Sequence, residues 1–186
     1  MKRIVRTSET DPLEIATVAA DAAKGAIGLT LCPGKHDPVA MSGAWARDLD
    51  TDLAAIRAWG AVALVSLIED HEFVLLRVPD LGRRAQALGL DWLHLPIMDV
   101  SVPGEAFESR WKRSGPVILS VLQRGERVVV HCRGGLGRSG LVAARMLVEL
   151  GVEAGEAIRR VRLARPGAVE MLEQEQYIRL QQTEGS

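Results

Sequence analysis

Short apolar runs alternate with amphipathic segments through the middle of the chain. Continuous apolar runs over 61–68 and 128–130 predict strands buried on both faces, and 92–96 predicts a third strand. Apolar residues recur every three or four positions over 46–59 and 78–87, which predicts helices with one buried face. This alternation indicates an α/β fold with a mostly parallel, twisted central sheet flanked by helices.

The two ends of the chain carry weaker patterns. Residues 1–11 are polar and predict a flexible N-terminal segment, which leaves 12–186 as a single domain. Runs at 13–19 and 26–32 favour two strands joined by a short connection, although a helix over 13–23 fits the first run equally well. Four more helices are predicted, at 105–123, 138–148, 153–162 and 169–180.

Composition narrows the class of protein. With 47% hydrophobic and 25% charged residues, the 186-residue chain is typical of a globular protein. A net charge of −1 argues against binding to nucleic acid by bulk electrostatics. Two distant cysteines form neither a disulfide framework nor a C-x-x-C metal site. No signal peptide and no apolar run of membrane-spanning length is visible, so we expect a cytoplasmic protein without a membrane span.

Candidate chemistry is concentrated between the strand at 128–130 and the helix that begins near Arg138. The connecting loop is rich in glycine and lies between Cys132 and Arg138. Such a loop turns backbone N–H groups inward, and the helix start adds free donors and a positive dipole end. This arrangement binds a tetrahedral anion and stabilises a nearby thiol as thiolate. The predicted phosphate-binding residues are Arg133, Gly134, Gly135, Leu136, Gly137 and Arg138.

Two other phosphate-binding motifs are excluded. Residues 135–140 also spell G-x-G-x-x-G, the dinucleotide-binding fingerprint. That motif requires a second parallel strand after the helix, with an acidic residue at its end, whereas the chain after Gly151 reads as helix, loop and helix. A Walker-type loop fails because no lysine directly precedes Ser139.

The segment His131-Cys132, five further residues, and Arg138-Ser139-Gly140 resembles the signature of the cysteine-dependent protein tyrosine and dual-specificity phosphatases. The sequence of residues 134–139 is most similar to that of the branch that contains the cyclin-dependent kinase-associated phosphatase. This resemblance implies a metal-independent hydrolase without a cofactor, in which Cys132 forms a phosphocysteine and Arg138 binds the phosphate oxygens. It also implies phosphoprotein substrates, with a phosphorylated kinase as one candidate.

The family's general acid lies in a loop that Pro96-Ile97-Met98-Asp99 matches. Asp99 would protonate the leaving oxygen and later deprotonate the attacking water, although an aspartate in a turn between prolines is also ordinary. We expect the loops that carry Asp99 and Cys132 to leave adjoining strands of the sheet. Three acidic residues after the 61–68 strand are the reserve candidates for the acid: Glu69, Asp70 and Glu72.

Several further residues have two interpretations each. Ser139 donates to the departing thiolate or caps the helix start, and His131 orients the loop or is a satisfied core histidine. Gln174 in the last helix positions the hydrolytic water or is solvated. Arg133 points outward and tunes substrate choice. Cys32 is a resolving partner for the oxidised nucleophile or, more simply, a buried strand residue.

Three rival functions remain open from the sequence. A phosphatase for phosphoinositides or RNA 5′-phosphates tends to carry extra basic residues in the loop, where this chain has Arg133 alone before Arg138. A non-catalytic phosphosite-binding module would normally lack the cysteine, the arginine or the acid. A redox or sulfur-transfer protein would use Cys132 but would not explain Arg138. Tyrosine and serine/threonine phosphosites are both left open.

Overall fold

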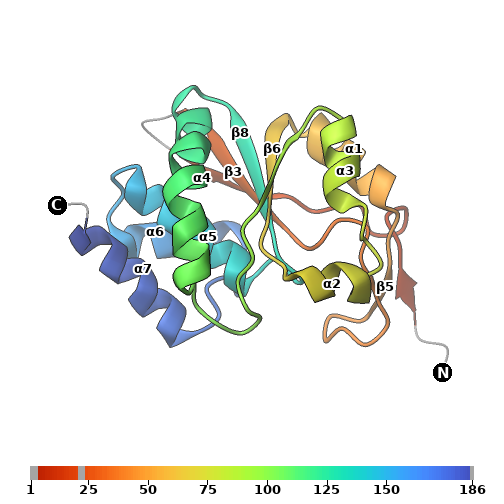
Figure 1. Ribbon diagram of the computed structural model, residues 1–186. Helices are drawn as coiled ribbons and strands as arrows, with labels where there is room; N and C mark the ends of the chain where they lie inside the picture. The colour runs from red at the N-terminus through yellow and green to blue at the C-terminus, as the bar shows by residue number, and fades with distance from the viewer. Residues whose placement is uncertain (1–3, 21–23, 185–186) are drawn as a thin grey trace.

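A five-stranded sheet forms the centre of the protein, with strand order β2-β3-β8-β6-β7 (Figure 1). The computed structural model describes residues 4–20 and 24–184. Strand β2 is antiparallel to β3, and every other neighbouring pair is parallel. The predicted α/β class with a mostly parallel sheet is therefore confirmed. The strands are β2 Ala16–Ala19, β3 Ala26–Thr30, β6 Ala61–Ser66, β7 Asp91–His94 and β8 Arg127–His131.

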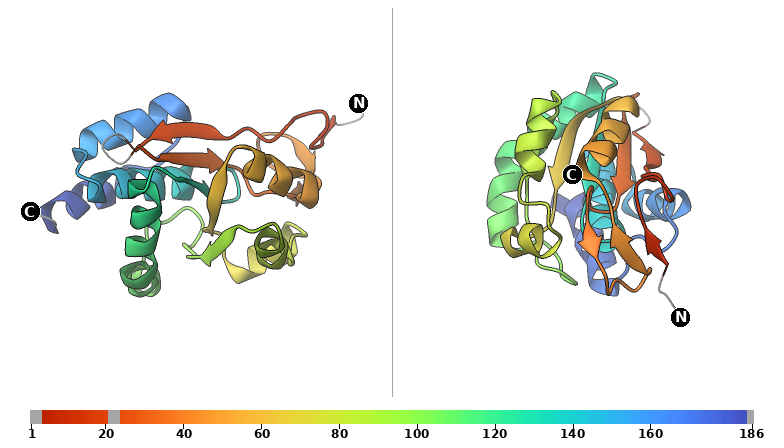
Figure 2. Two further views of the ribbon diagram at one scale, coloured as in Figure 1. Left: turned by 90° about the horizontal axis from the view of Figure 1, so that it is seen from above. Right: turned by 90° about the vertical axis from the view of Figure 1, so that its right-hand side faces the viewer.

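Helices cover both faces of this sheet. In Figure 1 and in the left view of Figure 2, α4–α7 gather on one side of β3, β8 and β6, and α1–α3 gather on the other. Val128 and Val130 of β8 pack in one hydrophobic cluster and Val129 in the second, which explains why this strand is apolar throughout. The helices are α1 Leu49–Ala58, α2 Asp70–Leu75, α3 Leu81–Ala87, α4 Glu105–Gln123, α5 Gly137–Glu149, α6 Ala154–Ala164 and α7 Leu172–Glu184.

The carboxyl ends of the four parallel strands lie together at one end of the sheet. His131 pairs with Thr30 on one side and with Ser66 on the other, and Ser66 pairs in turn with His94. Each of these terminal residues is polar, whereas the strand interiors are apolar. The loops that leave this end are those that carry the predicted site residues, as expected for a parallel sheet.

Several predicted boundaries differ from the structure. The helix predicted over 46–59 begins only at Leu49, because the Asp48 side chain accepts from the Thr51 N–H at 2.8 Å and caps it there. The helix over 78–87 shortens to α3, and helix α2 before it was not predicted. Helix α4 has the predicted bounds. The helical alternative for 13–23 is wrong, since β2 pairs along β3, and residues 21–23 of the predicted connection lie outside the described residues.

A second, smaller sheet lies beside the first and contains the beginning of the chain. Its order is β1-β5-β4, made of β1 Val5–Arg6, β5 Ala44–Ala46 and β4 His36–Asp37. Strand β1 runs parallel to β5, and β4 runs antiparallel to it. Residues 5–6 of the predicted flexible segment 1–11 thus form a strand, and the flexibility of this segment stays a prediction.

A buried polar network explains why this polar segment packs. Ser8 Oγ donates to Asp52 Oδ1 at 2.9 Å, and Arg47 donates to both Asp52 oxygens at 2.8 and 2.9 Å. Arg47 Nη1 also donates to the Asp11 carbonyl at 2.8 Å. A buried carboxylate needs such partners, and the contacts of Ser8 and Asp11 were not predictable because they join residues 36 to 44 positions apart.

Candidate active site

The glycine-rich loop connects β8 to α5 and places Cys132 at its start. The Gly135 N–H donates to the Cys132 sulfur at 3.2 Å. Gly135 has a φ of +73°, and a Cβ there would lie 2.5 Å from the Thr30 carbonyl oxygen. Only glycine can therefore fold the loop back against β3. A backbone donor and the sulfur thus converge, as the anion-binding prediction requires.

Arg138 lies at the first turn of α5 and forms a bidentate ion pair with Glu72. Nη1 donates to Glu72 Oε2 at 2.6 Å and Nη2 donates to Oε1 at 2.9 Å. Burial alone would lower the pKa of Arg138, but the Glu72 carboxylate raises it above its usual value. Burial would raise the pKa of Glu72, but hydrogen bonds from Arg138 and from the Glu69 N–H lower it. Both groups are therefore charged, and the guanidinium is fixed in orientation.

The ion pair of Glu72 with Arg138 was not predicted from the sequence, which indicated Glu72 only as a reserve candidate for the general acid. It lies in α2, where its side chain accepts from the Glu69 N–H at 2.8 Å and completes a capping box. The acidic cluster that precedes Phe73 is a helix-start signal and could have identified this helix. The signal does not indicate that the same carboxylate binds Arg138.

Asp99 reaches the same guanidinium from the loop after β7. Its Oδ1 lies 2.9 Å from Arg138 Nη2, and its side chain is 50% exposed. The prediction that the two loops leave adjoining strands is wrong, because β6 lies between β7 and β8. The loop crosses the end of β6, where the Ile97 N–H donates to the Leu67 carbonyl at 3.0 Å. The Ile97 carbonyl then accepts from Arg138 Nη1 at 3.1 Å.

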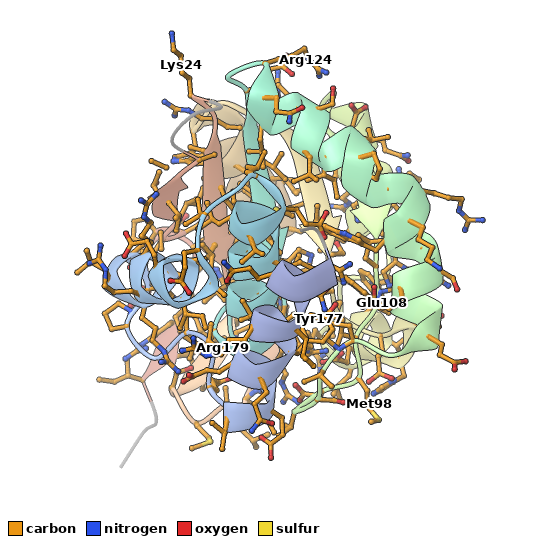
Figure 3. All side chains as sticks on the ribbon, turned by 90° about the vertical axis from the view of Figure 1, so that its left-hand side faces the viewer. Lys24, Met98, Glu108, Arg124, Tyr177 and Arg179 are labelled. Atoms are coloured by element: carbon orange, nitrogen blue, oxygen red, sulfur yellow. The ribbon has the colours of Figure 1, made fainter. Side chains whose placement is uncertain are left out.

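The residues that flank Asp99 are exposed and apolar. Met98 is 64% and Val100 71% exposed, and Met98 lies at the outer end of the molecule in Figure 3. Val100 has a φ of +52°, which is strained for a β-branched residue. The loop therefore presents its carboxylate between two apolar side chains on a constrained backbone.

His131 forms hydrogen bonds that join the sheet to the loop. Its Nε2 lies 2.6 Å from Ser66 Oγ, which accepts from Trp92 Nε1 at 2.9 Å. The Cys132 carbonyl can only accept, so Nδ1 carries a proton and donates to it at 3.2 Å, and in the neutral ring Nε2 then accepts from the Ser66 hydroxyl. Burial lowers the pKa of His131 to about 4, so the ring is neutral. Both ring nitrogens of this buried histidine are therefore satisfied, and its role in orienting the loop stays a prediction.

Ser139 and Gln174 lie buried beside the loop, each with an oxygen that has no hydrogen-bond partner among residues 4–20 and 24–184. Gln174 Nε2 donates to the Ser101 carbonyl at 3.3 Å and lies 3.2 Å from where a Cβ on Gly137 would be. Buried polar oxygens are normally paired, so both are available to a bound group. Their predicted roles remain predictions.

Two predicted residues lie away from the anion-binding side of the loop. Arg133 donates from Nε to Asp37 Oδ2 at 3.0 Å, with Nη2 at 2.9 Å, so its side chain is held toward β4. Cys32 is fully buried in the hydrophobic cluster that does not contain Cys132. Burial raises the pKa of Cys32, which keeps this thiol protonated.

Lys35 is a second residue to which the sequence assigned no role. It is 2% exposed, and its ammonium donates to the Arg133 carbonyl at 3.2 Å.

In the described part of the chain, no group of three or more histidine, cysteine or acidic side chains is arranged to hold a metal ion. No helix of that part is both long enough and apolar enough to cross a membrane.

A family model described as "Polymorphic toxin system, DSP-PTPase phosphatase" matches residues 39–152, which include Asp99, Cys132 and Arg138. The chain belongs to this family. The predicted resemblance to dual-specificity phosphatases is thus confirmed for a span that includes the loop and the predicted acid. Lys35 and Gln174 lie outside the residues that the DSP-PTPase model matches.

Curated relatives and a solved structure agree with this assignment. Cyclin-dependent kinase inhibitor 3 of Rattus norvegicus is 30% identical over 135 residues, which are 71% of this chain and 62% of that protein. Tyrosine-protein phosphatase CDC14 of Saccharomyces cerevisiae is 41% identical over 51 residues, or 27% of this chain and 9% of that protein. The chain therefore spans less than two thirds of the length of either relative.

The crystal structure of kinase associated phosphatase, with its catalytic-site cysteine replaced by serine, superposes with a TM-score of 0.81. It is 24% identical in sequence, and the match covers 94% of this chain and 96% of that chain. This likeness shows a shared fold. The mixed sheet, with one antiparallel strand at its edge, belongs to that fold.

Proposed function

We propose that this protein is a cysteine-dependent phosphatase that hydrolyses phosphate monoesters on proteins, without a metal. The observation that carries the proposal is that Asp99 and Glu72 both bind the guanidinium of Arg138, six residues after Cys132. Nucleophile, phosphate-binding cation and candidate acid are thereby brought together at one loop. The exposed Asp99 carboxylate occupies a face of Arg138 that a substrate phosphate would take over.

In the first step, the Cys132 thiolate attacks phosphorus and forms an S–P bond while the bond from phosphorus to the leaving oxygen breaks. Asp99 gives its proton to that oxygen, so the leaving group departs as an alcohol or phenol. The loop N–H groups and Arg138 stabilise the equatorial oxygens. Glu72 fixes the guanidinium plane so that this contact needs no reorganisation.

In the second step, water attacks the phosphocysteine, and Asp99 takes the proton from that water. The S–P bond breaks, inorganic phosphate forms, and the electron pair returns to the Cys132 sulfur. The unpaired Ser139 hydroxyl supports a role in donating to that sulfur, and the position of Gln174 near Gly137 supports a role in orienting the water. His131 acts through the Cys132 carbonyl and holds the loop start in place.

A protein substrate is favoured over the rival substrates by the charges at the loop. Arg133 is the extra basic residue before Arg138, and Asp37 already binds it. A polyphosphorylated lipid or RNA end would need further free cations at this position. The apolar side chains of Met98 and Val100 beside the acid fit a peptide surface. A silent phosphosite-binding module would not need the candidate acid.

The proposal extends to the domain organisation, the substrate and the location of the protein. Residues 12–186 act as one phosphatase domain, with 4–11 packed onto it. A phosphorylated kinase is the candidate substrate, because two similar proteins carry kinase-related names. A reducing, cytoplasmic location suits a catalytic thiol.

Hydrolysis of p-nitrophenyl phosphate in the presence of a chelator tests the proposal. We expect turnover by the natural chain and none by Cys132→Ser, because the oxygen nucleophile is not ionised by the loop. Asp99→Asn should be slower and should lose the alkaline limb of the pH–rate profile. Unchanged turnover in Cys132→Ser would refute the mechanism. A panel of phosphopeptides and phosphoinositides then decides between the substrate classes.

A further inference from the structure

The ammonium group of Lys35 is buried against the phosphate-binding loop. Lys35 is 2% exposed, its Nζ lies 3.2 Å from the Arg133 carbonyl oxygen, and Nζ lies 5.3 Å from the centroid of the Trp45 ring. A buried ammonium is costly unless anions or dipoles compensate it. Its position therefore calls for an explanation that the mechanism above does not supply.

The hydrogen bond from Lys35 fixes one peptide unit of the loop. The Arg133 carbonyl accepts from Lys35 Nζ and also from the Cys32 N–H at 3.4 Å. In a trans peptide the C=O and N–H groups point in opposite directions, and no cis peptide occurs in the described residues. With the Arg133 carbonyl directed toward Lys35 and Cys32, the Gly134 N–H points to the opposite side of that peptide.

The charged groups around Lys35 do not keep its ammonium from binding the loop. The ionisable groups that face it are Asp37, Arg133, Cys32 and Cys132. Burial lowers the pKa of Lys35 below its usual value, and Arg133 lowers it further, whereas Asp37 opposes this change. Asp37 is already bound by Arg133 at 2.9 Å, which offsets part of its negative charge. The Arg133 carbonyl therefore remains the hydrogen-bond acceptor of the Lys35 ammonium.

We infer that Lys35 is a positioning residue of the phosphate-binding loop. Its ammonium orients the Arg133–Gly134 peptide so that the Gly134 N–H donates to a bound oxyanion. The catalytic part of this inference rests on the proposed phosphatase function. The oxyanion-binding part does not, because it can be measured without turnover.

Binding of tungstate, measured by calorimetry in a Cys132→Ser background, tests the orientation of the peptide. We expect Lys35→Met to bind tungstate about tenfold more weakly, the effect of losing one charge-assisted hydrogen bond. Lys35→Gln keeps a donor and should lose less affinity than Lys35→Met. The matched control is Lys112→Met, which removes an exposed lysine from α4 and should bind as the parent does.

Values of kcat/KM for p-nitrophenyl phosphate, in the chain that retains Cys132, test the same contact during turnover. A bound phosphate loses one loop donor when Lys35 no longer holds the peptide, so Lys35→Met should lower kcat/KM by about tenfold and Lys35→Gln should lower it less. A residue with only a packing role would lower stability without lowering kcat/KM of the folded fraction.

The outcomes separate this inference from the proposed function. Equal tungstate affinity and equal kcat/KM in Lys35→Met and Lys112→Met would overturn the inference even in an active enzyme. An inactive natural chain would end the proposed function, while the tungstate comparison would still decide the role of Lys35. Where Lys35→Met shows no cooperative thermal unfolding, Lys35→Gln decides by the same two measurements.

Discussion

Helix α5 carries two buried arginines, Arg138 at its first turn and Arg145 about two turns later. Arg138 is 2% exposed and Arg145 6%. Each is bound by glutamate side chains at 2.9 Å or less, and these carboxylates raise the pKa of both guanidinium groups although burial opposes them. Burial, charge and pairing therefore do not distinguish the two residues.

The two arginines differ in where their partners come from. Around Arg145 every partner is a side chain from a helix: Glu108 at 2.8 Å, Glu149 at 2.7 Å, and the Tyr177 hydroxyl. Figure 3 shows Glu108 on α4 facing Tyr177 on α7. The guanidinium carbon also lies 4.9 Å from the centroid of the Trp111 ring. These contacts join three helices, around a guanidinium that is buried while its two glutamate partners are partly exposed.

Arg138, by contrast, has one partner that can leave. Glu72 is buried, but Asp99 is 50% exposed and belongs to a loop. Under the proposed function, a phosphate replaces this loop carboxylate without moving a helix, whereas replacing Glu108 or Glu149 at Arg145 would displace a side chain fixed on a helix. A buried arginine is thus indicated as functional by an exchangeable anion, and burial of the charge alone does not indicate it.

The largest effect is expected from substituting lysine at each arginine and comparing activity. Arg138→Lys should lower kcat/KM for p-nitrophenyl phosphate by about a thousandfold, because an ammonium cannot hold Glu72 and the phosphate oxygens in one plane. Arg145→Lys should leave kcat/KM close to that of the natural chain. Losses of similar size in both variants would mean that the exchangeable partner does not distinguish the two sites.

The reverse contrast is expected in stability. Arg145→Met should lower the free energy of unfolding in urea by about 3 kcal/mol, because Glu108 and Glu149 lose their cation. Turnover of the folded fraction should be retained. Arg124→Met is the control, since its ion pair with Glu126 is exposed and should contribute less than about 1 kcal/mol. A cost at Arg145 no larger than at Arg124 would show that the helix cluster is not a stabilising core element.

The phosphate-binding loop could be predicted because its signal is contiguous. Strand, glycines, arginine and helix all fall within residues 127–149, where each local preference agrees with the next. Glu72 and Lys35 could not be predicted in their observed roles. Glu72 is 66 residues from Arg138, and Lys35 is 98 residues from the Arg133 carbonyl that it binds. Contacts at such separations are set by the sheet order, which periodicity does not contain.

The order of the strands also explains why one prediction was wrong, namely that the loops of Asp99 and Cys132 leave adjoining strands. The alternation of strands and helices correctly indicated parallel strands, but a right-handed crossover is satisfied whether β7 lies beside β8 or beyond β6. Helix α2, at Asp70–Leu75, was missed because six residues are too few to show helical periodicity. Asp99 was nevertheless correctly placed at the edge where the strands end, because that inference needs only parallel strands.

Acid should destabilise the phosphate-loop region more than the Arg145 region, through His131. Burial lowers its pKa from 6.5 to about 4, so below pH 6.5 the unfolded chain binds a proton that the folded chain does not. Stability is therefore lost as the pH falls, by about 2 kcal/mol between pH 7.5 and pH 5 from this group. The pKa of Tyr177 is raised by burial, so its hydroxyl stays protonated over this range.

Urea unfolding at the two pH values measures this loss. His131→Asn removes the titrating ring and should lose less stability over the same interval, by about 2 kcal/mol. An identical loss in the natural chain and in His131→Asn would show that other groups carry the acid sensitivity.

The smallest contrast concerns one hydroxyl in each region. Ser139 Oγ has no hydrogen-bond partner in residues 4–20 and 24–184, so Ser139→Ala should leave the free energy of unfolding within about 0.5 kcal/mol of the natural value. It should slow hydrolysis of the phosphoenzyme by about tenfold, because the departing thiolate loses a donor. The burst amplitude with p-nitrophenyl phosphate measures this accumulation.

Tyr177→Phe should do the opposite. The Tyr177 hydroxyl bonds with Glu108 and Arg145, so its loss should lower the free energy of unfolding by about 1 kcal/mol and leave the burst unchanged. Loss of the unpaired Ser139 hydroxyl should therefore change the burst, and loss of the paired Tyr177 hydroxyl should change the free energy of unfolding. If Ser139→Ala lost stability and Tyr177→Phe lost turnover, the assignment of catalysis to one end of α5 and of packing to the other would be reversed.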